Sequence, residues 1–104
     1  MNECADPEPG YTVAHTREMD SETMVEEMGL SPGDTVRPAE DESRGAVRRV
    51  DSVGLGRIHF HHPLVSHPQD ARYGGRAAFD QPVAEWYAAW RRGELVPAQL
   101  TVEA

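Results

Sequence analysis

The segment "GLGRIHFHH", residues 54–62, decides the fold prediction because apolar and polar side chains alternate along it. Ile58 and Phe60 alternate with two histidines, which is the period of two expected of a strand with one buried face. Pro63 follows and cannot donate to a sheet ladder, so the strand should end there. We therefore predict a strand that buries Ile58 and Phe60 and turns its imidazoles outward.

Shorter strand signals, bounded by Gly and Pro, surround this segment. In one of them Val47 and Val50 are an odd number of residues apart, so they cannot share a face of a regular strand. A bulge near Arg48–Arg49 would reconcile them. The last signal is interrupted by Pro97, which predicts an edge strand. The signals are "PGDTVRP" (32–38), "GAVRRVDSV" (45–53), "GRAAF" (75–79) and "ELVPAQLTV" (94–102).

Two helices are predicted. The segment "DQPVAEWYAAWRRGEL" has an apolar stripe at i, i+3, i+4 and i+7 and predicts an amphipathic helix over 82–92. A shorter, Met-containing helix should begin near Ser21 and end at Gly29. Residues 1–20 show no apolar period and are expected to form a flexible acidic arm. The remainder, 21–104, should form a single domain.

The order of these elements predicts a fold that is mainly β with added α. We expect a small bent antiparallel sheet or SH3-like barrel of about five strands. The "PGDTVRP", "RGAVRRV" and "GRIHF" segments resemble the strands of SH3-like barrels of the KOW type. The chain departs from that pattern in an insert over 63–75 and in its long helix.

The order Gly-Asp-x-Val-Arg at 33–37 and Arg-Gly-x-Val at 44–47 is similar to the barrel of the nitrile hydratase β subunit. The metal of that enzyme is held by its other subunit. This resemblance therefore implies a non-catalytic scaffold within a larger complex.

Composition limits the partners. The chain has 104 residues, a formal net charge of −8, ten arginines and no lysine. Phosphate binding depends on clustered cations, so direct nucleic-acid binding is not expected. No apolar run is long enough to span a bilayer, and the acidic N-terminus lacks the order of a signal peptide, which predicts a cytoplasmic protein. The single cysteine, Cys4, excludes an internal disulfide.

The histidines are the candidate metal ligands. His59 and His61 are two residues apart on one strand and could share an ion. The candidates for a third ligand are His67 first, and also His15, Asp70 and Asp80. Zinc would accept three such ligands, and non-haem iron would take two histidines and a carboxylate. The alternative is two imidazoles on the exposed face of a strand, so no cofactor is required by the pattern.

The aromatic residues of the long helix are the candidate partner-binding residues. In a short chain they mostly form core, but Trp86 and Trp90, at i and i+4, could leave one ring edge exposed. Trp, Tyr and Arg together are typical of interface hot spots. The predicted partner-binding residues are Trp86, Tyr87, Trp90, Arg76, Arg91 and Arg92.

These observations favour a non-enzymatic accessory, adaptor or regulatory module that binds another protein through an Arg-flanked aromatic patch. Three alternatives stay open. The acidity could serve an inhibitor that mimics nucleic acid in a basic groove. The histidines could make a metal-binding protein, or the chain could be a nitrile-hydratase-like enzyme subunit. A homo-oligomer is compatible with each of them.

Overall fold

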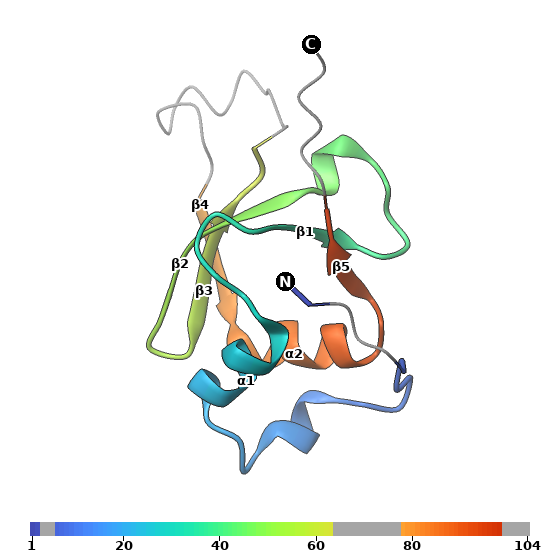
Figure 1. The fold of residues 1–104 in the computed structure, drawn as a ribbon, viewed down its shortest axis with the longest axis vertical. Helices are drawn as coiled ribbons and strands as arrows, with labels where there is room; N and C mark the ends of the chain where they lie inside the picture. The colour runs from blue at the N-terminus through green and yellow to red at the C-terminus, as the bar shows by residue number, and fades with distance from the viewer. Residues whose placement is uncertain (3–5, 64–77, 99–104) are drawn as a thin grey trace.

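The computed structural model describes residues 1–2, 6–63 and 78–98. A curved sheet forms one side of the molecule, and the two α-helices pack on each other beneath it (Figure 1). In chain order the elements are η1 (Val13–Thr16), α1 (Ser21–Met28), β1 (Thr35–Pro38), η2 (Arg44–Ala46), β2 (Arg48–Gly54), β3 (Arg57–His61), β4 (Ala78–Pro82), α2 (Val83–Arg91) and β5 (Leu95–Pro97).

The five strands form one antiparallel sheet in the order β4-β3-β2-β1-β5. The predicted fold class, a bent five-stranded antiparallel sheet with a short N-terminal and a longer C-terminal helix, is confirmed. Among the described residues the sheet is open, with β4 and β5 as its edges. The similarity to SH3-like barrels stays a prediction. The edge position predicted for the strand that contains Pro97 is confirmed by β5.

The apolar stripe of α2 anchors the core. Val83, Trp86, Tyr87 and Trp90 are all buried, and they pack with apolar residues of α1 and the sheet. The helix begins at Val83 without a side-chain cap. Gln81, which could have capped the helix, instead accepts a hydrogen bond of 2.6 Å from Trp86 Nε1. The predicted helix is thus confirmed to within one residue at each end.

The short helix α1 begins at Ser21, as predicted. Its N-cap is Asp20, whose Oδ1 accepts a 2.7 Å hydrogen bond from the backbone N–H of Thr23. Gly29 ends the helix in the left-handed conformation, as predicted. The hydrogen bond from Thr23 lowers the pKa of Asp20, because it stabilises the carboxylate form.

Removing this cap should lower thermal stability in a pH-dependent way. Because the pKa of Asp20 is depressed in the folded state, its contribution is present above the unfolded pKa and is lost as pH falls through the folded value. Asp20→Ala should therefore melt a few degrees below the wild type at about pH 7, and the gap should narrow as pH falls below about 4, the ordinary pKa of aspartate. Melting curves followed by circular dichroism test this. Asp20→Asn is the control, because it keeps an N-cap that does not titrate; a gap for Asp20→Ala that is constant with pH would contradict the assignment.

A β-bulge interrupts β2, but not where the sequence suggested. Val50 pairs with Phe60 and Ser52 pairs with His59, which leaves Asp51 as the extra residue. The bulge expected near Arg48–Arg49 is therefore wrong in position. Val47 does not need one, because it is buried just ahead of the strand rather than within it. The bulge lets Val50 and Val53 face the same side of the sheet.

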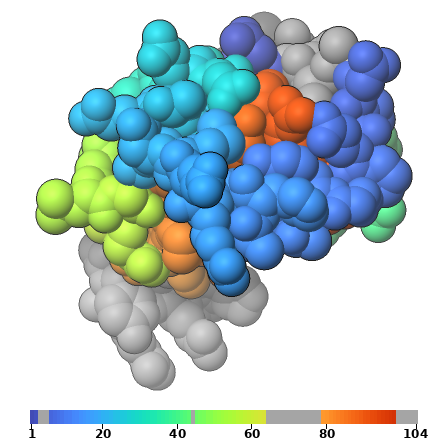
Figure 2. All heavy atoms as spheres, turned by 90° about the horizontal axis from the view of Figure 1, so that it is seen from below, coloured from blue at the N-terminus to red at the C-terminus, as the bar shows by residue number. Residues whose placement is uncertain are grey.

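The N-terminal segment was expected to be a flexible arm, but its described part packs along α2. Trp90 Nε1 donates a 2.5 Å hydrogen bond to the carbonyl of Asn2, and the N–H of Glu8 donates to the carbonyl of Arg91 at 2.8 Å. Figure 2 shows this segment spread across the face beneath α2. Side chains of α2 reach backbone groups of the arm, an interaction that needs no apolar period and leaves no sequence pattern.

Candidate functional site

The two strand histidines have different environments. His59 is exposed, whereas His61 is only 4% exposed. His61 Nδ1 lies 2.9 Å and 3.0 Å from the two carboxylate oxygens of Asp51, the bulge residue. The expectation that both imidazoles face solvent is therefore wrong for His61. The β-bulge explains the difference, because it places the carboxylate of Asp51 beside the His61 ring.

The structure does not assemble the predicted metal ligands. Among the described residues, no group of three or more His, Cys, Asp or Glu side chains could hold a metal ion. One ring nitrogen of His61 is already taken by Asp51. His67, the predicted third ligand, lies outside the described residues. Metal binding by His59 and His61 stays a prediction.

The aromatic residues predicted to bind a partner lie in the core. Trp86, Tyr87 and Trp90 are all buried. The Tyr87 hydroxyl donates a 3.0 Å hydrogen bond to Glu27 Oε2. Burial, together with the nearby Glu27 carboxylate, raises the pKa of Tyr87. These rings are therefore not exposed, which differs from the surface patch expected from the sequence.

Two of the three arginines of that predicted patch have acidic partners. Arg91 pairs with Glu8 of the arm, and its guanidinium lies 5.2 Å from the centroid of the Tyr11 ring. Arg92 Nε lies 2.9 Å from Glu94 Oε2. Arg76 lies outside the described residues. The chain's own acidic residues thus neutralise this face of α2.

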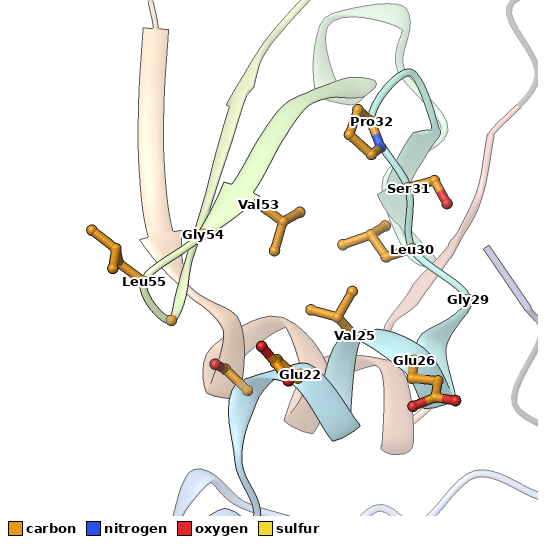
Figure 3. A pocket seen from close by; sticks show the side chains of 12 residues that line it. Glu22, Val25, Glu26, Gly29, Leu30, Ser31, Pro32, Val53, Gly54 and Leu55 are labelled. Atoms are coloured by element: carbon orange, nitrogen blue, oxygen red, sulfur yellow. The ribbon is translucent and has the colours of Figure 1, made fainter.

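A groove lies between α1 and the β2–β3 hairpin. It has a volume of about 970 Å³, and Val25, Leu30, Pro32 and Val53 contribute apolar surface to it. Figure 3 shows the side chains of Val25, Leu30 and Val53 converging from the helix, the following loop and the strand. We call this feature the hairpin groove. Its volume is that of a ligand site, and its open form suits a segment of another protein.

The hairpin groove is acidic. Glu22 and Glu26 of α1 line it, and both side chains are exposed. None of the twelve described residues that line the groove is basic. The groove therefore combines apolar walls with a negative rim, which attracts a basic ligand and disfavours an acidic one.

Leu55, at the tip of the hairpin, is in an unfavourable position for a leucine. It has φ +53° and is followed by Gly56 at +72°, the positive pair of a type I′ turn, which prefers Asn, Asp or Gly. Its side chain is fully exposed and projects from the turn away from Val53 (Figure 3). A left-handed conformation costs an L-residue about 1–2 kcal/mol. Because the Leu55 side chain is fully exposed, its own packing does not offset that cost.

The sequence reasoning missed both the hairpin groove and Leu55. One local signal was available: "GLG" at 54–56 joins two strands where a hairpin normally has Asn-Gly or Asp-Gly. The groove itself joins α1 to a hairpin more than twenty residues further along the chain. A local sequence pattern cannot reveal a contact between segments that are so far apart in the chain.

Comparisons with known proteins do not assign the chain to a family. No family model, curated protein sequence or solved structure matches the chain. In the part of the chain that the structure describes, no helix has the length and apolar character needed to cross a bilayer.

Proposed function

We propose that the chain is a protein-interaction module and that the hairpin groove, with Leu55 beside it, is its docking surface. The observation that carries this proposal is Leu55, a fully exposed leucine in a left-handed turn conformation. A left-handed backbone at a non-glycine residue is uncommon, and residues held in that conformation cluster at functional sites. A partner that covers Leu55 supplies the missing compensation.

The chemistry of the groove defines the partner. Val25, Leu30 and Val53 favour apolar side chains, while Glu22 and Glu26 favour Lys or Arg next to them. The occupant is thus a segment of another protein in which apolar residues are flanked by basic ones. An amphipathic helix with such residues at i, i+3 and i+4 would present them on one face.

A stability measurement and a binding measurement on Leu55→Asn test the proposal together. The probes are a synthetic amphipathic Leu/Lys helical peptide and its Leu/Glu counterpart, titrated into 15N-labelled protein. We expect the Leu/Lys peptide to shift resonances of α1 and the hairpin, and the Leu/Glu peptide to shift none. Leu55→Asn should weaken binding of the Leu/Lys peptide about tenfold. The same variant should raise the free energy of unfolding by about 1 kcal/mol, because Asn adopts the left-handed turn conformation more readily than Leu.

Charge reversal supplies the matched control. Glu26→Lys at the groove rim should weaken binding of the Leu/Lys peptide. Glu40→Lys makes the same change at an exposed loop residue outside the groove and should leave that binding unchanged. Added salt should weaken binding to the wild type. Equal weakening by both variants would show a non-specific charge effect. Equal binding of the Leu/Glu peptide, or a loss of stability in Leu55→Asn, would also overturn the proposal.

A further inference from the structure

Arg48, at the start of β2, lies over two neighbouring aromatic rings. Its guanidinium carbon is 5.5 Å from the centroid of the Phe60 ring and 5.5 Å from that of the Trp86 ring. Burial lowers the pKa of Arg48, which reflects the partial loss of water around the charge. Stacking on aromatic faces compensates part of that loss, and a guanidinium stacked by its face keeps its N–H donors at its edge, where they can bind an acceptor.

Arg48 differs from the other partly buried arginines that the structure describes. Arg37, Arg91 and Arg92 each have a carboxylate oxygen within 4.0 Å. No described carboxylate lies within that distance of Arg48. In a chain with eighteen acidic and ten basic residues, a partly buried cation with no carboxylate partner among the described residues is unusual. A desolvated guanidinium is most stable when a carboxylate accepts its hydrogen bonds.

The two rings beneath Arg48 are buried, and the exposed aromatic surface near them comes from a further ring. Phe79, on edge strand β4, stacks on Phe60 at 5.7 Å and is 45% exposed. The His62 ring packs edge-on against Phe79 at 5.4 Å. We call Arg48, Phe60, His62, Phe79 and Trp86 the Arg48 cluster. Arg together with exposed aromatic surface is the composition of interface hot spots.

We infer that the Arg48 cluster is a second binding site, one that receives a carboxylate side chain next to an apolar side chain from a partner protein. The carboxylate would accept paired hydrogen bonds from the guanidinium edge, and the apolar side chain would cover Phe79. The net charge of −8 repels anions at long range. Selectivity for an acidic group must therefore come from direct contact with Arg48.

This site is independent of the proposed docking surface. Arg48 begins β2, whereas the hairpin groove is at the opposite end of that strand, beside Gly54 and Leu55 (Figure 1). The ligands of the two sites also have opposite charge. Titrations of the same labelled protein can therefore show separately whether the Arg48 cluster and the hairpin groove bind their ligands.

The test compares two small probes that differ only in charge, acetyl-Phe-Glu-amide and acetyl-Phe-Gln-amide. Each is titrated at millimolar concentration into 15N-labelled full-length protein, and the resonances of Trp86 Nε1–H and Arg48 Nε–H are followed. We expect the Glu probe to shift both signals and to bind about tenfold more tightly than the Gln probe. Arg48→Met should abolish this preference.

Arg49→Met is the matched control, because it removes the same charge from the adjacent, exposed residue and should leave the preference intact. Asp70→Asn tests whether the one acid between β3 and β4 in the sequence is itself the occupant. Tighter Glu-probe binding in that variant would overturn the inference of a partner carboxylate. Equal binding of the two probes, no binding of the Glu probe, or equal losses in Arg48→Met and Arg49→Met would also overturn it. A melting curve for Arg48→Met verifies that this variant is folded. If Arg48→Met is unfolded and Arg48→Lys is stable, Arg48→Lys takes its place. It keeps the charge but not the paired donors, so it should bind the Glu probe more weakly than the wild type does.

Discussion

Replacing Trp90 with alanine should destabilise the fold by about 3–5 kcal/mol, the range for deleting a large buried aromatic side chain. Trp90 is 6% exposed and packs against Tyr87 with ring centroids 5.7 Å apart. A domain of this size has a total stability of about 5–15 kcal/mol. The substitution should therefore leave the chain marginally folded or unfolded. Urea denaturation followed by circular dichroism measures the effect.

A second substitution separates the packing of Trp90 from its hydrogen bond. Trp90→Phe keeps most of the apolar volume but removes the Nε1–H that donates to the Asn2 carbonyl at 2.5 Å. Leaving that carbonyl unpaired should cost about 1–3 kcal/mol. Hydrogen exchange should also become faster in the first residues of the arm. A stable Trp90→Ala protein would show that this ring is not part of the core and would restore it as a surface candidate.

The second large effect is expected at Ile58. This side chain is fully buried in β3, opposite Val53 of β2 and Gln81 of β4. Ile58→Ala should cost about 2–5 kcal/mol, because it removes packed methyl groups and leaves a cavity. Leu55 offers a matched control three residues away in the same hairpin. Since Leu55 is fully exposed, Leu55→Ala should change stability by less than about 0.5 kcal/mol.

Guanidinium denaturation of the two variants side by side measures this contrast. Both substitutions remove the same number of carbon atoms from an aliphatic side chain, so composition cannot explain a difference between them. Similar losses in the two variants would mean that Leu55 is packed rather than exposed. The proposal that a partner covers Leu55 would then lose its main support.

Much of the fold could be predicted because its strongest elements have local patterns. The stripe of Val83, Trp86 and Trp90 repeats at the helical period, and Ile58 and Phe60 repeat at the strand period. Each pattern places one apolar face, and burying both faces together forces the helix against the sheet. The fourth strand was predicted at 75–79 but lies at Ala78–Pro82, because Phe79 is its only strong apolar signal.

The other features depend on contacts between distant residues. Asp51 is the bulge residue because its neighbours Val50 and Ser52 pair with the adjacent residues Phe60 and His59 of β3. The arm is held by hydrogen bonds to α2, about eighty residues away in the sequence. Neither arrangement follows from spacing along the chain, which is why the bulge was misplaced and the arm was expected to be flexible.

The surface that we propose differs in place from the one predicted from the sequence. A surface that combines Arg with aromatic rings was expected on α2, but Arg91 and Arg92 are paired with acids there. A comparable combination exists around Arg48 and Phe79, on strands whose neighbouring order the sequence does not specify. Only Trp86 belongs to both sets. Local composition indicates which residue types gather, whereas strand order decides where they meet.

The open sheet has a consequence for self-association. An unpaired strand edge can template the addition of further copies, which is the first step toward aggregation. Both edges of this sheet limit that process: β5 is only three residues long and ends at Pro97, and β4 ends at Pro82 and carries the charged Asp80. Proline lacks the N–H that an incoming strand requires. The edges of the described sheet can therefore stay unpaired without promoting fibre-like stacking of further copies.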